Sequence, residues 1–177
     1  MAEVFTNALK KSAGIVTTSS AGTINANTNT ILGVSTAGVS AGDLVDNQHF
    51  RGNAKVSVIG PQQVTVDNVS TNEVTATGQV VRFLTPTTAY TSPAGTKSIL
   101  IGGTFANLTN GNVNISVEVS SGSTSTIIAN NIPVPSGSSF VISDAGKTVL
   151  LANDVIKIYC DTANAVDVTL GILQGVN

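Results

Sequence analysis

The sequence predicts an all-β protein, for three reasons. Short segments rich in valine and isoleucine recur along the chain, several with an apolar residue at every second position. Glycine, asparagine, serine and proline stand between these segments, as they do in tight turns. No stretch shows the apolar spacing of a helix of ordinary length. We therefore expect antiparallel sheets built from short strands.

The composition limits both the number of modules and the kinds of partner. At 177 residues the chain can form one sizeable core or two small ones, and we expect two β modules. Hydrophobic residues make up 41% of the chain, which is not the composition of a disordered protein. A nucleic-acid surface needs basic and aromatic side chains, whereas the net charge is −2 and tryptophan is lacking. We expect no direct binding of nucleic acid.

The chain shows no membrane or targeting signal. No run of about 18 apolar residues is present for a membrane-spanning helix. Residues 1–8 contain an acid, Glu3, and lack the apolar core of a secretory signal. We therefore expect no membrane association and synthesis in a cytoplasm. The single cysteine, Cys160, cannot form an intrachain disulfide and ends an apolar segment, which is typical of a small buried hydrophobe.

Residues 1–16 look like an N-terminal arm. Phe5, Ala8 and Leu9 could share one helical turn, but no second turn of apolar residues follows. Residues 14–16 have the composition of a strand. An apolar arm at a terminus packs either on its own chain or on a neighbouring subunit. We therefore identify Val4, Phe5 and Leu9 as candidate assembly residues.

Residues 17–84 are predicted to form a small β module. Residues 17–30 are small and polar, and strand signals follow at 30–34, 42–45, 55–59, 63–66 and 73–83. Gly60 and Pro61 predict a reversal between 55–59 and 63–66, because proline fixes φ and glycine admits positive φ. The expected product is a small barrel or meander, whose core is marginal on its own at this size.

Residues 85–177 carry the strongest strand pattern and predict an antiparallel β-sandwich. The expected strands cover 98–101, 113–119, 139–142, 148–151, 154–159 and 166–170, with turns between them that include Ala145-Gly146. Gly102 and Gly103 predict a bulge in the first of these strands. Proline cannot donate to a β-ladder, so residues 132–135 belong on a sheet edge or in a loop.

Two features could indicate a catalytic or zinc site, and we interpret neither in that way. Residues 38–42 (GVSAG) match the nucleophile elbow of serine hydrolases, but that elbow requires a following helix, which the sequence does not predict. We interpret the motif as a surface turn. His49 is the only histidine and has no nearby cysteine with which to share a zinc ion. We expect it at the surface or at an interface.

The acidic residues show no catalytic or calcium-binding pattern. Asp43 and Asp46 lie close together but lack the further oxygen ligands that calcium needs. Asp43 and Asp154 each precede an apolar strand, as turn residues do. Glu118 occupies an alternate position of a strand and is expected to face water. With no acid pair, metal motif or phosphate-binding loop, the sequence predicts no enzyme, no cofactor and no metal ion.

Four separated stretches resemble small virion structural proteins of tailed bacteriophages, especially those of marine cyanophages. They are residues 1–8 (MAEVFTNA), 90–107 (YTSPAGTKSILIGGTFAN), 132–139 (IPVPSGSS) and 149–158 (VLLANDVIKI). In shorter relatives the first motif runs almost directly into the second. The resemblance therefore implies that residues 17–84 are inserted in a sandwich formed by residues 85–177. It also implies that the arm, residues 1–16, completes this sandwich with a first strand at 14–16.

The resemblance further implies a place in the virus particle. It implies a non-enzymatic virion protein, made in the host cytoplasm, most specifically a capsid decoration or cement protein that binds the major capsid protein. A neck, collar, tail or fibre protein is the alternative location, and a carbohydrate- or receptor-binding sandwich is the alternative class. The arm could add a strand to a neighbour's sheet. Closed symmetry is usual in such assemblies, and we expect a homo-oligomer, taken as a trimer.

Overall fold

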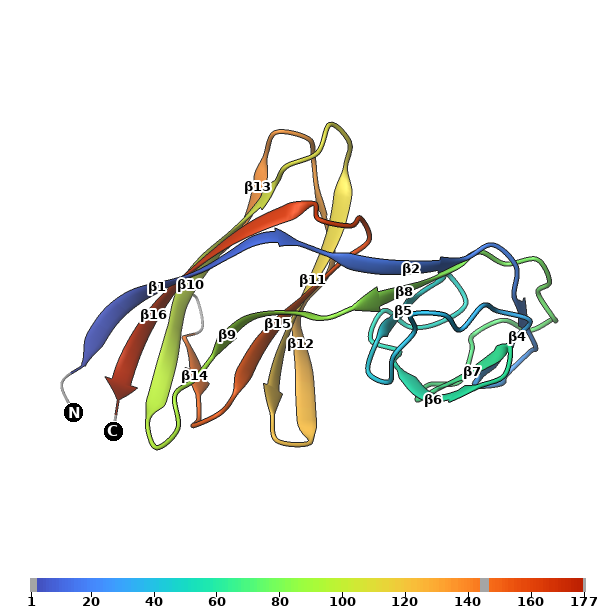
Figure 1. Ribbon diagram of the computed structural model, residues 1–177, viewed down its shortest axis with the longest axis horizontal. Helices are drawn as coiled ribbons and strands as arrows, with labels where there is room; N and C mark the ends of the chain where they lie inside the picture. Colours follow the sequence, from blue (N-terminus) through green and yellow to red (C-terminus); the bar gives the residue numbers. More distant parts are fainter. Residues whose placement is uncertain (1–2, 144–146, 177) are drawn as a thin grey trace. The chain divides into compact units, whose positions relative to one another are not determined.

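The computed structural model describes residues 3–143 and 147–176, and all regular structure in these residues is β (Figure 1). The predicted all-β class is confirmed. No helix in this part of the chain is long and apolar enough to cross a membrane. The turn predicted at Ala145-Gly146 lies outside the described residues.

The chain divides into two compact units. Unit 1 combines Met1–Gly14 with Thr87–Asn177, and unit 2 is Ile15–Pro86. The expected boundaries differ by two residues at each junction, 16 against 14 and 84 against 86. The chain therefore enters unit 2 after a single strand of unit 1 and then returns to complete unit 1.

Unit 1 is a sandwich of two antiparallel sheets (Figure 1). The first sheet has the order β1-β16-β10-β13, with β14 also paired to β10: β1 is Val4–Ala13, β10 Lys97–Asn107, β13 Ser139–Ile142, β14 Thr148–Leu150 and β16 Val166–Val176. The second sheet has the order β12-β11-β15-β9: β9 is Thr87–Thr91, β11 Val113–Ser121, β12 Thr124–Val134 and β15 Val155–Cys160.

Side chains from both sheets fill one core. Successive residues of a strand point to opposite faces, and the inward positions include Leu100 and Phe105 of the first sheet and Ile115 and Ile156 of the second. Cys160 is buried in the same core, as predicted. Burying one large aliphatic side chain contributes about 1.5–3 kcal/mol. This shared core therefore holds the two sheets together.

The N-terminal segment is a strand, and it belongs to unit 1. β1 runs antiparallel to β16 in unbroken register from Val4 to Lys10, and its last residue, Ala13, is buried in the core. The expectation that residues 14–16 form the first strand of the sandwich is wrong. β1 is that strand, whereas β2 (Ile15–Ser19) pairs with β8 of unit 2. Small and polar residues in β1 weaken the apolar alternation that would have indicated the strand.

Unit 2 contains two small antiparallel sheets around its own core of isoleucine, valine, phenylalanine and alanine. Their orders are β2-β8-β5 and β3-β4-β7-β6: β3 is Thr23–Ile24, β4 Thr30–Leu32, β5 Leu44–Asp46, β6 Val56–Gly60, β7 Gln63–Val66 and β8 Val81–Thr85. The strand predicted at 73–83 is wrong for most of its length. Only its end lies in β8, and Val74 is largely exposed.

Two predicted backbone irregularities are confirmed. The register of β10 on β16 shifts between Leu100 and Gly102, which is a bulge. The hairpin from β6 to β7 reverses at Pro61 and Gln62. The positive φ in that turn, +54°, falls on Gln62 and not on Gly60. Proline at the second position of the turn and a positive φ at the third are the features of a type II turn.

A similar turn precedes a strand in each unit. The carboxylate of Asp43 accepts the main-chain N–H of Ser40, and that of Asp154 accepts the N–H of Leu151, both at 2.8 Å. Each aspartate also donates its own N–H to the carbonyl of the same residue. The residue before each aspartate has positive φ. The predicted turn role of both acids is confirmed, and each carboxylate closes the turn that it ends.

Candidate assembly surface

The outer face of the first sheet of unit 1, the side turned away from the core, is largely apolar. Phe5 of β1 lies opposite Leu173 of β16. On its other side Leu173 lies opposite Ile99 of β10, which in turn lies opposite Val149 of β14. Cross-strand partners project to the same side of a sheet. These four side chains therefore form one apolar row across four strands, with Phe5 77% exposed at its end.

A shallow hollow lies beside this row. Gly171 of β16 is opposite Asn7 of β1 on one side and opposite the bulge of β10, which contains Ile101 and Gly102, on the other. Because Gly102 and Gly171 have no side chains, the surface of the sheet is lower there than along the apolar row. The depression there has a volume of about 450 Å³, and Phe5, Asn7 and Ile101 are among the residues that line it.

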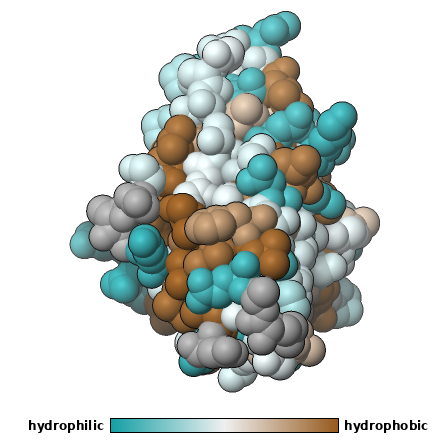
Figure 2. All heavy atoms as spheres, turned by 90° about the vertical axis from the view of Figure 1, so that its left-hand side faces the viewer, coloured by the Kyte–Doolittle hydropathy of each residue, from teal (hydrophilic) through white to brown (hydrophobic). Residues whose placement is uncertain are grey.

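A second row lies beyond the hollow. Leu9 is opposite Thr169, Thr169 is opposite Thr104, and Thr104 is opposite Val141. Leu9 is 71% exposed and Val141 54%. Neither row contains a charged residue. Figure 2 shows hydrophobic residues gathered on the side of unit 1 where β1 begins and β16 ends.

Soluble monomers rarely expose apolar patches larger than a few hundred Å² unless the patch binds something. The two rows and the hollow between them gather Phe5, Leu9, Val141 and Val149, four exposed large apolar residues of unit 1, on one face. We therefore identify the outer face as the candidate functional site. A partner would bind this face mainly through the hydrophobic effect, which is non-directional and grows with the apolar area that is buried.

The structure places all three predicted assembly residues on β1. Phe5 and Leu9 point to the outer face, whereas Val4, also more than half exposed, points to the opposite side of the strand. The rest of the face was not predicted. Ile99 and Leu173 look like core residues in the sequence, because a register that joins distant strands is not visible in one chain. The run 98–101 (SILI) was the available signal, since apolar residues on both faces of a strand indicate contact on both sides.

The other candidate residues do not come together in a reactive site. Residues 38–42 form turns in unit 2, and the carbonyl of Gly38 accepts a hydrogen bond from Thr17 Oγ1. His49 is partly exposed, with its ring beside the Gln48 amide. Within residues 3–143 and 147–176, no group of three or more histidine, cysteine, aspartate or glutamate side chains is placed to hold a metal ion.

Unit 2 has a polar depression of similar size, lined by Asp46, Asn47, Gln48, Gln79, Val80 and Arg82. The guanidinium of Arg82 lies 2.6 Å from the carboxylate of Asp46, so opposite charges are matched within the depression. None of the six lining residues is aromatic, although small-molecule sites are commonly lined by apolar and aromatic side chains. The depression therefore gives little support to a carbohydrate-binding role.

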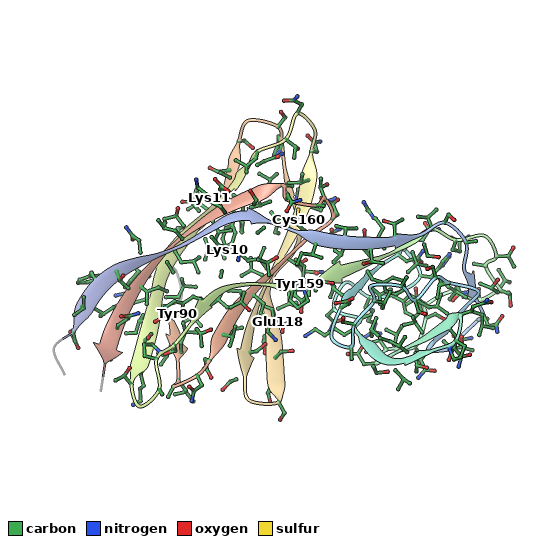
Figure 3. The ribbon with its side chains drawn as sticks, viewed as in Figure 1. Lys10, Lys11, Tyr90, Glu118, Tyr159 and Cys160 are labelled. Carbon is green, nitrogen blue, oxygen red and sulfur yellow. The ribbon has the colours of Figure 1, made fainter. Side chains whose placement is uncertain are left out.

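Glu118 does not face water, and that prediction is wrong. Its side chain is 1% exposed, and its carboxylate oxygens accept hydrogen bonds from Ser120 Oγ at 2.8 Å and from Tyr159 Oη at 3.0 Å (Figure 3). Lys157 Nζ lies 3.9 Å away. A buried carboxylate is tolerated when it is paired and hydrogen-bonded in this way. The cluster links β11 to β15 and is closed to a solute, so we interpret it as structural.

Replacing Glu118 with alanine is expected to lower the free energy of unfolding by about 2–3 kcal/mol, because two buried hydroxyls lose this acceptor. Chemical denaturation of both proteins measures the difference. Glu73→Ala is the control, since Glu73 is exposed and an ordinary surface change stays within about 0.5 kcal/mol. Equal stability of the two variants would show that the cluster contributes nothing to the fold.

The candidate site is therefore a surface rather than a pocket. It is built by register, by one bulge and by two glycines, and each of these depends on the pairing of β1, β16 and β10. Comparisons with known protein families, curated proteins and solved structures found no match to this chain.

Proposed function

We propose that this protein is a non-enzymatic structural component of a bacteriophage virion, specifically a decoration or cement protein that binds the major capsid protein on the assembled head. The observation that carries the proposal is the pair of uncharged rows with exposed apolar side chains on the outer face of unit 1. The resemblance of residues 1–8, 90–107, 132–139 and 149–158 to phage virion proteins supports it.

A surface of this kind suits binding to a lattice. Burial of a few hundred Å² of apolar area contributes several kcal/mol at about 25 cal/mol per Å². Association costs of similar size oppose it, so a single contact is weak. Many copies bound to one assembled shell stabilise that shell by mass action, even though each contact is modest. Only 10% of the residues are charged, so the contact is not governed by long-range electrostatics.

A neck, collar, tail or fibre position would use the same surface at a different copy number. A decoration protein repeats with the capsid lattice, whereas axial structures hold about six or twelve copies or small multiples of them. Quantitative mass spectrometry of purified particles, scaled to the major capsid protein, distinguishes the two locations. Hundreds of copies per particle support decoration.

Val149→Asp tests the proposal at the end of the outer face farthest from β1. The exposed valine tolerates the change in the free protein, but a carboxylate buried against a partner is strongly unfavourable. We expect at least a tenfold lower copy number in particles, measured as above. Point changes are preferable to deletion of residues 2–12, because that deletion removes the strand paired with β16.

Val74→Asp is the matched control, because it places the same charge at an exposed valine of unit 2. It should enter particles at the wild-type copy number, and both variants should melt like the wild type. Incorporation of Val149→Asp at the wild-type level would contradict the proposed surface. Absence of the wild-type protein from purified particles would contradict the proposed function.

A further inference from the structure

β1 ends the first sheet of unit 1 and leaves one side of its backbone open. Among the described strands its ladder partner is β16, and every residue from Glu3 to Ser12 is at least partly exposed. The unpaired N–H and C=O groups of such an edge are a template for another strand. The register of β1 is unshifted from Val4 to Lys10, so this part of the edge is regular.

The other edges of unit 1 are less suited to pairing. β12 contains Pro133, has Asn131 at positive φ and shifts register twice along β11. Proline and bulges are the usual means by which an edge is blocked. β9, β13 and β14 have five, four and three residues. β1, with ten residues, is therefore the longest edge strand of unit 1 without a proline.

We propose that β1 pairs antiparallel with β1 of a second copy of this chain, about a two-fold axis that passes through Asn7. In this register Phe5 lies opposite Leu9 of the second copy, and Leu9 lies opposite its Phe5. Just outside the regular part of the edge, Glu3 lies opposite Lys11 of the second copy, and Lys11 opposite its Glu3. The order of side chains along the outer face of β1 is thus complementary to itself when the strand is reversed.

The sequence of β1 selects this register over its neighbours. A two-fold axis perpendicular to the sheet keeps both outer faces on one side only if outward residues pair with outward residues. The alternative registers that meet this condition therefore differ from the proposed one by a shift of two residues. One step in one direction places Glu3 opposite Leu9. One step in the other direction places Phe5 opposite Lys11. Both alternatives lose the apolar pairs and the charge pairs together.

On the opposite side of β1, the proposed register places Lys10 beside Val4 of the second copy. A lysine on an edge strand ordinarily discourages pairing. Here its apolar stem can cover the exposed valine while the ammonium group reaches water. The inference thus gives all three predicted assembly residues, Val4, Phe5 and Leu9, a contact in one interface.

Pairing in this way joins the two outer faces into one. The row that begins at Phe5 continues into the row that ends at Leu9 of the second copy, which doubles the width of the apolar surface. A two-fold contact is isologous and yields a dimer, in place of the trimer expected from the resemblance. The dimer concerns the edge of the sheet and the proposed function concerns its face, so the two proposals can fail separately.

Asn7→Cys tests the axis directly in the full-length protein. Residues that pair with themselves across an antiparallel ladder have Cα atoms about 4.5–5.5 Å apart, which a disulfide can span. Leu9→Cys is the control, because Leu9 and its symmetry mate lie four residues apart along the ladder and are too distant to bridge. Cys160 is fully buried and does not interfere. Oxidation followed by non-reducing electrophoresis reads the result.

We expect a covalent dimer from Asn7→Cys and none from Leu9→Cys, with a dimer mass for the wild type by light scattering. A monomeric wild type at millimolar concentration overturns the proposal, as does the lack of a disulfide in Asn7→Cys. Equal cross-linking of both variants overturns the register.

The charge pair supplies an independent test. Glu3→Lys faces Lys11 of the second copy with a like charge, and because the contact occurs twice we expect the dimer dissociation constant to rise about tenfold at low salt. Glu3→Lys combined with Lys11→Glu restores opposite charges and should return the constant to near the wild-type value. A double variant as weak as the single one contradicts the pairing. Incorporation into particles is not needed for either measurement.

Discussion

Replacing Gly14 with alanine is expected to destabilise unit 1 by about 3 kcal/mol or more. Gly14 has φ of +122°, a conformation in which other residues are strained. A Cβ atom at this position would lie 2.3 Å from the main-chain oxygen of Thr162. The backbone has little freedom to move away, because Gly14 N–H donates to Thr87 Oγ1 and Gly14 C=O accepts from Asn164 N–H. Strain and clash therefore add.

Denaturant unfolding of Gly14→Ala and of Gly95→Ala separates these two contributions. Gly95 also has positive φ, but nothing lies within 4 Å of the Cβ that alanine would add. The control should therefore lose only about 1 kcal/mol from backbone strain. Equal losses at the two positions would mean that the approach of Thr162 to Gly14 is not a constraint.

Ile156→Asp is expected to prevent unit 1 from folding. Ile156 is fully buried in β15, with β11 on one side and β9 on the other. An unpaired carboxylate in this core costs several kcal/mol, in addition to the lost packing. Small domains have about 5–15 kcal/mol of stability in total, so little or none remains. Circular dichroism and calorimetry should show no cooperative transition for unit 1.

Val149→Asp controls for the effect of introducing an aspartate into a strand. It makes a valine-to-aspartate change at an exposed position of β14 and should keep the wild-type transition within about 0.5 kcal/mol. If Ile156→Asp melted like this control, Ile156 would not point into the core, and β15 would face the core with its opposite side.

Apolar alternation predicted the strands that have one buried face. The segment 63–66 and the segment 139–142 coincide with β7 and β13. Gly102 also lies at the predicted bulge, and Pro61 lies in the predicted turn. These features are local, so a single sequence contains them.

The missed elements depend on partners distant in the sequence. Most residues of β12 are exposed, so its sequence lacks the alternation of apolar and polar residues that indicates a strand. It is a strand because it pairs with β11 at the edge of the sheet. Glu118 has the spacing of a solvent-facing residue, and its burial follows from Tyr159 and Ser120. Val80 lies in the strand predicted at 73–83, yet it falls outside β8 and is more than half exposed. Tertiary contacts override local pattern in each case.

The candidate surface was predicted only in part, for the same reason. Phe5 and Leu9 were identifiable because an apolar side chain near a terminus needs a partner. Val149 joins them only through three successive registers, from β14 to Ile99 of β10, from β10 to β16 and from β16 to β1. The hollow depends on Gly171 lying opposite the bulge of β10, which no local signal indicates.

Unit 2 begins and ends at neighbouring points of the fold. Ile15 and Thr85 are register partners in β2 and β8, and Gly14 N lies 3.3 Å from Thr87 Oγ1 in unit 1. No linker residue separates the two units at either crossing. Unit 2 is therefore a cassette that a gene can gain, lose or exchange at one site, while every strand pairing of unit 1 is retained.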